Sequence, residues 1–63
     1  MKYMIINSNT AWYKRYDGTE EEAIAETERM SEFHGRQYSL LDDTGRLIGK
    51  TYIPEPAYIF LKG

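Results

Sequence analysis

The chain has 63 residues, no cysteine and a formal net charge of −2 at pH 7. This length allows one domain, residues 1–63, and excludes a doubly wound nucleotide-binding sheet or a barrel enzyme. Without cysteine the chain forms neither a disulfide scaffold nor a thiolate metal site. No segment approaches the roughly 20 apolar residues of a membrane span, and no leader or lipidation signal is evident, so we expect a cytoplasmic protein without membrane contact.

The first two predicted elements are strands joined by a turn. Residues 2–7 carry apolar side chains on both faces, a pattern that is typical of a central strand. Tyr3 and Ile5 share one face, and Met4 and Ile6 share the other. Asn7-Ser8-Asn9 indicates a turn. Residues 10–16 predict a second strand, and Asp17-Gly18 ends it.

Residues 20–34 predict a helix. Thr19 is a good N-cap, Glu22 completes a capping box, and Gly35 suits a left-handed C-cap. A turn of 100° per residue divides the helix into two faces. The face predicted to be buried comprises Ala23, Ile24, Thr27, Met30, Phe33 and His34. The face predicted to be exposed comprises Glu21, Ala25, Glu28, Arg29 and Glu32.

The C-terminal half predicts two more strands, residues 37–42 and 46–53, around a turn in which Gly45 takes the left-handed position. Gly49, inside the second of these strands, indicates a bulge or a close backbone contact. Pro54 and Pro56 end that strand, because proline donates no ladder hydrogen bond. Residues 57–61 are either a short fifth strand or a tail folded over the sheet. We therefore predict an α+β fold of order β-β-α-β-β, with one helix packed on a small, mainly antiparallel sheet.

No arrangement of residues indicates catalysis, a cofactor or a metal site. His34 lacks a second ligand at helical spacing, so we expect it to cap or pack. Ser39 lies in the middle of a predicted strand and is expected to face solvent. Asp42 and Asp43 are adjacent turn formers rather than two carboxyls in different environments. The glycines are isolated and form no phosphate-binding loop. We predict that the protein is not an enzyme.

Two surfaces are candidates for binding a partner. Residues 19–32 contain six glutamates and a single arginine, and the helix face predicted to bind is Glu21, Glu28 and Glu32. The second surface is the aromatic and basic run Trp12, Tyr13, Lys14, Arg15 and Tyr16. If Trp12 and Tyr16 pack inward, Lys14 must reach the edge of the core, and Tyr13 and Arg15 face solvent.

The predicted β-β-α-β-β order contains two short motifs. These are the helix start Thr-x-x-Glu-Ala-Ile at residues 19–24 and the hairpin Asp-x-Gly-Arg at residues 43–46. In size, acidity and element order the chain resembles short phage-encoded inhibitors of host enzymes, including anti-defence proteins, a resemblance that assigns no functional residue. We predict a small non-catalytic interaction module, an inhibitor or adaptor that binds a larger protein. The alternatives are a weak single-stranded nucleic-acid binder using residues 12–16 and a homo-oligomeric scaffold paired through edge strands.

Overall fold

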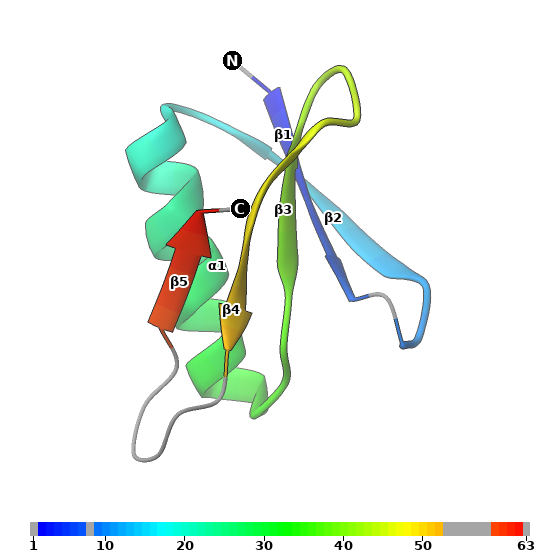
Figure 1. Ribbon diagram of the computed structural model, residues 1–63, viewed down its shortest axis with the longest axis vertical. Coiled ribbons are helices and arrows are strands. Elements are labelled where there is room, and N and C mark those ends of the chain that lie inside the picture. Colours follow the sequence, from blue (N-terminus) through cyan, green and yellow to red (C-terminus); the bar gives the residue numbers. More distant parts are fainter. Residues whose placement is uncertain (1, 8, 53–58, 63) are drawn as a thin grey trace.

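The computed structural model describes residues 2–7, 9–52 and 59–62, which form five strands and one helix (Figure 1). The elements in chain order are β1 (Lys2–Asn7), β2 (Trp12–Asp17), α1 (Glu20–His34), β3 (Ser39–Asp42), β4 (Leu47–Tyr52) and β5 (Ile59–Lys62). The predicted α+β class and element order are confirmed, and the C-terminal segment is a fifth strand rather than a tail. Residues 53–58, which include both prolines, and Ser8 of the predicted turn lie outside the described residues.

The strands form one sheet in the order β2-β1-β3-β4-β5, and every neighbouring pair is antiparallel. β1 therefore lies inside the sheet, as its two apolar faces predict. β2 begins two residues later than expected, because Ala11 adopts a left-handed backbone with φ of 57° that cannot continue a strand. Figure 1 shows α1 on one side of the sheet, behind β4 and β5, and within the described ranges α1 is the one layer that covers the sheet.

The helix has the predicted bounds and caps. The Thr19 hydroxyl accepts the Glu22 N–H at 3.1 Å, and the Glu22 carboxylate accepts the Thr19 N–H at 2.9 Å. Gly35 takes the left-handed conformation, and its N–H bonds to the Ser31 carbonyl. Local chemistry therefore determines both ends of α1.

Two residues of the predicted buried helix face, Phe33 and His34, are exposed, so the prediction is wrong for both. Phe33 is 83% exposed. Among the described residues, the one aromatic ring that it contacts is His34, edge-on, with ring centroids 5.1 Å apart. The buried stripe is centred on Thr27, and at 100° per residue Phe33 lies about 120° around the helix from it. Glu26 and Ser31, which the sequence pattern did not assign to the core, are buried instead.

The core lies between α1 and the sheet. Six residues are buried in it, and four half-buried apolar side chains, Tyr16, Ile24, Ile48 and Phe60, pack against them. The six buried residues are Tyr3, Ile5, Ala23, Met30, Tyr38 and Leu40. Two buried hydroxyls join the helix to the sheet, because Ser31 and Thr51 hydrogen-bond at 2.6 Å and Thr51 also accepts the Tyr38 N–H at 2.9 Å.

Gly49 confirms the prediction of a bulge and a close contact. The register of β3 against β4 shifts between Leu40 and Leu41, which is how a bulge accommodates an extra residue. A Cβ on Gly49 would lie 2.4 Å from the Leu61 carbonyl oxygen of β5. Gly45 takes the predicted left-handed position, with φ of 87°.

Candidate interaction surface

The strand register determines which side chains point away from α1. Residues that face each other across antiparallel strands lie on the same side of the sheet. Tyr3 and Ile5 pack toward α1, so Met4 and Ile6 point to the opposite side, together with their partners Arg15 and Tyr13 on β2. We call this side the open face. Its residues are Lys2, Met4, Ile6, Tyr13, Arg15, Asp17, Ser39, Leu41, Leu47, Lys50, Tyr52 and Leu61.

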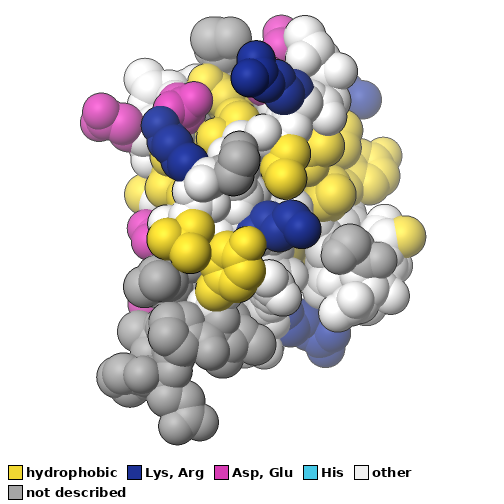
Figure 2. All heavy atoms as spheres, viewed as in Figure 1, with side chains coloured by type: hydrophobic (Ala, Val, Ile, Leu, Met, Phe, Trp, Pro, Cys, Tyr) yellow, Lys and Arg dark blue, Asp and Glu magenta, His cyan; other side chains and the backbone are white. Residues whose placement is uncertain are grey.

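Large apolar side chains dominate the open face. Met4, Ile6 and Leu41 are half-buried. Leu47, Tyr52, Leu61 and Tyr13 are 38%, 43%, 51% and 58% exposed. In the view of Figure 2, hydrophobic side chains gather over the sheet with lysines and arginines between them, and acidic side chains lie at the margin. Exposed apolar surface of this kind makes the open face a candidate interaction site.

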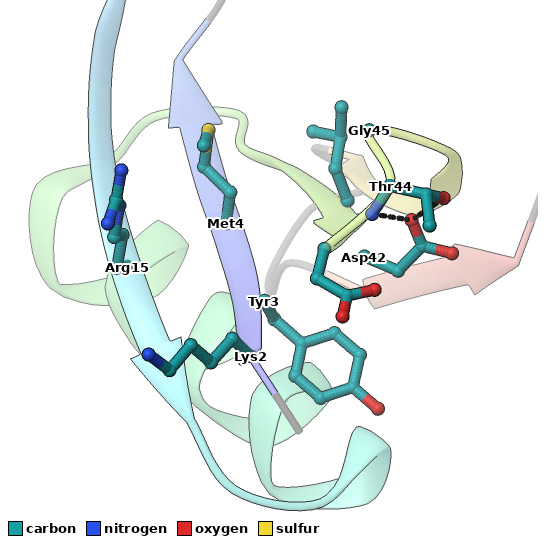
Figure 3. Close-up of a pocket in the computed structure, with 9 residues that line it drawn as sticks. Lys2, Tyr3, Met4, Arg15, Asp42, Thr44 and Gly45 are labelled. Carbon is teal, nitrogen blue, oxygen red and sulfur yellow. Dashed lines mark hydrogen bonds between the residues drawn. The ribbon is translucent and has the colours of Figure 1, made fainter.

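A groove of about 430 Å³ lies at one end of the open face. Met4 and Leu41 line it, with Lys2 and Arg15 on the side of β2 and the turn of residues 42–45 on the other side (Figure 3). The groove is therefore apolar at its centre, with basic groups along one side and Asp42 and Asp43 along the other.

The turn beside this groove is held by Asp42. Its carboxylate accepts the Thr44 hydroxyl at 2.6 Å and the N–H groups of Thr44 and Arg46 at 2.9 Å each. The hydrogen bond from the Thr44 side chain, followed by that from the Arg46 N–H, lowers the pKa of Asp42. The carboxylate is thus committed to the turn, which confirms its predicted role as a turn former. Ser39, expected to face solvent, is buried at 9% exposure between β1 and β4 neighbours, so that prediction is wrong.

The run from Trp12 to Tyr16 is divided between the two sides of the sheet, in the alternation predicted for inward packing of Trp12 and Tyr16. Tyr13 and Arg15 lie on the open face. Tyr16 packs against the core, and the Trp12 ring meets Tyr38 edge-on, with centroids 5.8 Å apart. The five residues therefore do not form one binding surface.

Lys14 belongs to an ion cluster on the helix side. Its Nζ lies 2.8 Å from the Glu26 carboxylate, which also accepts hydrogen bonds from the Arg29 guanidinium. The hydrogen bonds from Arg29 and then Lys14 hold the pKa of Glu26 below its ordinary value of 4.5, against the opposing effect of burial. Glu26 is only 8% exposed, and the two cations, whose side chains are 43% and 72% exposed, compensate its charge from the solvent side. This cluster explains why a glutamate lies in the buried stripe of α1.

Several glutamates of α1 make contacts within the chain that the sequence did not predict. Glu28 is half-buried and accepts the Phe60 N–H of β5 at 3.3 Å. Glu20 pairs with Lys62 at 2.8 Å, and Glu22 is held in the capping box. Of the three residues predicted to bind a partner, Glu21 and Glu32 are exposed, whereas Glu28 joins the helix to the sheet edge.

Sequence reasoning missed most of the open face, namely Met4, Ile6, Leu41, Leu47, Lys50, Tyr52 and Leu61. The available signal was the apolar residues on both sides of residues 2–7. We interpreted that pattern as a central strand, which the sheet order confirms, and did not infer from it that one face of the strand lacks a covering layer. In the structure it marks a strand covered on one face only.

Residues that can carry chemistry are sparse in the described part of the chain. Within the described ranges, no group of three or more His, Asp or Glu side chains can hold a metal ion, so His34 belongs to no such group. Its Nδ1 lies 2.8 Å from the Tyr38 hydroxyl. No helix of residues 2–7, 9–52 and 59–62 is long and apolar enough to cross a membrane. Comparison with protein-family models, curated proteins and solved structures gave no match.

Proposed function

We propose that this chain is a non-catalytic interaction module, an inhibitor or adaptor in the cytoplasm, that docks on a larger protein through its open face. The observation that carries the proposal is the apolar side of the sheet that α1 does not cover. A domain this small has little apolar surface to spare, since it buries only about 60% of what its unfolded chain exposes. Apolar side chains on the side away from the core are therefore costly unless a partner covers them.

The chemistry of the open face favours a protein partner over nucleic acid. Five of its seven large apolar side chains are aliphatic: Met4, Ile6, Leu41, Leu47 and Leu61. Aliphatic side chains pack against other side chains but offer no ring on which a base can stack. The net charge of −2 also disfavours a polyanion.

Charge favours a partner with an acidic rim over a second copy of the chain. Arg15 and Lys50 project from the open face and form no ion pair with the described residues, whereas the glutamates are concentrated on α1. Two copies docked face to face would bring together three cations from each copy, Lys2, Arg15 and Lys50, against one carboxylate among the described residues of that face, Asp17. This excess of like charge across an interface opposes association. We therefore propose a partner whose apolar surface is flanked by carboxylates.

Two matched variants test this proposal. Tyr13→Glu replaces a ring of the open face, 58% exposed, with a negative charge. Phe33→Glu introduces the same charge at the end of α1, in place of a ring that is 83% exposed. The parent protein and the two variants are each used for affinity capture from the source cell. The expected partner is one that the parent and Phe33→Glu retain and that Tyr13→Glu loses. Calorimetry with the purified partner should then show about thirtyfold weaker binding for Tyr13→Glu, as expected when a charge replaces an aromatic residue of the interface.

Three results would overturn the proposal. Equal retention by the two variants would show that the open face is not the contact. Capture of nuclease-sensitive material would indicate single-stranded nucleic acid instead. Light scattering that reports a dimer lost in Tyr13→Glu, with no heterologous partner captured, would indicate a homo-oligomer.

A further inference from the structure

A second surface lies on the helix side of the sheet, around Trp12. Trp12 is the only tryptophan of the chain. It is 42% exposed. Its ring rests edge-on against Tyr38, which is only 4% exposed, and the Tyr38 hydroxyl lies 2.8 Å from His34 Nδ1. A buried residue thus holds the indole and the imidazole in fixed positions, so both rings are preorganised before anything binds.

Two hollows meet at these rings. The first, of about 310 Å³, is lined by Asn7, Thr10 and Arg36 in addition to Trp12, His34 and Tyr38. The second, of about 260 Å³, shares Trp12 and His34 with the first. Trp12 therefore lines both hollows and can contact a ligand in either.

The first hollow offers hydrogen-bond donors that the described residues leave unused. Asn7 is 4% exposed, and its side-chain oxygen accepts the Asn9 N–H at 3.0 Å. Its amide nitrogen donates no hydrogen bond to a described residue. Asn7 lines the first hollow, so its amide nitrogen is a candidate donor to a ligand bound there. The exposed Arg36 guanidinium likewise forms no ion pair within the described ranges.

The second hollow has the opposite character. Its cations, Lys14 and Arg29, are both bound to Glu26, so neither is free to bind an anion. Met30 and Phe33 add apolar surface beside Trp12. An anionic group is therefore attracted to the first hollow, and an aromatic ring to the surface of Trp12.

We propose that the two hollows form a binding site for a small planar aromatic molecule that carries an anionic group. The ring packs against Trp12, and the anion accepts hydrogen bonds from Arg36 and the Asn7 amide. A volume near 300 Å³ is at the lower end of small-molecule sites and suits one ring on a short arm. The site faces the opposite way from Tyr13 and Arg15, so it is independent of the open face and of the proposed docking function.

Trp12 fluorescence tests the site directly, because no other tryptophan contributes to the emission. AMP should quench the emission saturably, adenosine should bind about tenfold more weakly because it lacks the anion, and inorganic phosphate should not quench. Phenylacetate distinguishes the source of the anion. If it binds as AMP does, the site accepts aromatic carboxylates, and if AMP alone binds, the site takes nucleotides.

Arg36→Gln and Arg15→Gln form a matched pair, since both arginines are exposed and each substitution removes one positive charge. Arg36→Gln should weaken AMP or phenylacetate binding about tenfold, and Arg15→Gln should leave it unchanged. The Asn7 side-chain amide resonances should shift on saturation. Equal losses in the two variants, an unshifted Asn7 amide, or quenching that never saturates with either anion would refute the site.

Discussion

Replacing Gly49 with alanine tests how tightly β4 and β5 are joined. The new Cβ would lie 2.4 Å from the Leu61 carbonyl oxygen and 2.7 Å from a Phe60 ring carbon. Ordinary contacts begin near 3.4 Å, so the β5 backbone must retreat by about 1 Å, the difference between those distances. Overpacking of this kind costs about 1–3 kcal/mol, and each ladder hydrogen bond that lengthens adds about 1 kcal/mol.

We therefore expect Gly49→Ala to lower the free energy of unfolding by about 2–4 kcal/mol, most of the roughly 3–5 kcal/mol available to a domain of this size. Urea denaturation followed by circular dichroism measures the loss, and amide exchange in β5 shows whether this strand detaches first. The control is Gly45→Ala, where no atom lies within 4 Å of the added Cβ and only the positive φ of 87° is strained.

The control should lose about 1 kcal/mol, the cost of a left-handed alanine. Phe60→Leu combined with Gly49→Ala should restore only part of the stability, because the nearer clash is with the backbone oxygen and remains. If Gly49→Ala is as stable as Gly45→Ala, the close approach of β5 to Gly49 is refuted. If Phe60→Leu fully restores the stability of Gly49→Ala, the Phe60 ring alone causes the clash.

Two further substitutions test the core and the ion cluster. Phe33→Ala should change the free energy of unfolding by no more than about 0.5 kcal/mol, because Phe33 is 83% exposed. Leu40→Ala, at a fully buried site, should cost about 2–5 kcal/mol in urea denaturation. A loss from Phe33→Ala larger than about 0.5 kcal/mol would contradict the position of the buried stripe. Glu26→Gln should cost about 1 kcal/mol at pH 7. Because the pKa of Glu26 is lowered from 4.5 in the folded state, its stabilisation is complete above that value and is lost as the pH falls through the lower folded pKa. The difference between the parent and Glu26→Gln should therefore shrink below pH 4.5, and a constant difference down to acid pH would exclude the ion cluster as its cause.

The sequence predicted the elements whose determinants are local. Thr19, Glu22 and Gly35 fix the helix ends through chemistry that spans a few residues. Gly45 fixes the hairpin turn in the same way. The alternation of residues 12–16 was also predictable, because side chains in a strand change sides at every step.

Features that depend on distant segments were not predictable. Glu26 is buried because Lys14 reaches it from β2, and Ser31 is buried because Thr51 of β4 meets its hydroxyl. Neither partner is visible in the periodicity of the helix. The open face was missed for a related reason, since alternation shows that a strand has two apolar faces but not how many layers cover them.

The separation of charge between the two sides of the sheet also affects how the protein meets other molecules. Glu21 and Glu32 lie on the exposed surface of α1, and Arg15 and Lys50 lie on the open face. The molecule therefore has an electric dipole across its thickness, although its net charge is only −2. In the field of an acidic partner such a dipole rotates the basic side forward during diffusion, and encounters become productive more often at low ionic strength. For the proposed acidic partner, this arrangement would raise the rate of association through orientation, separately from the strength of the final contact.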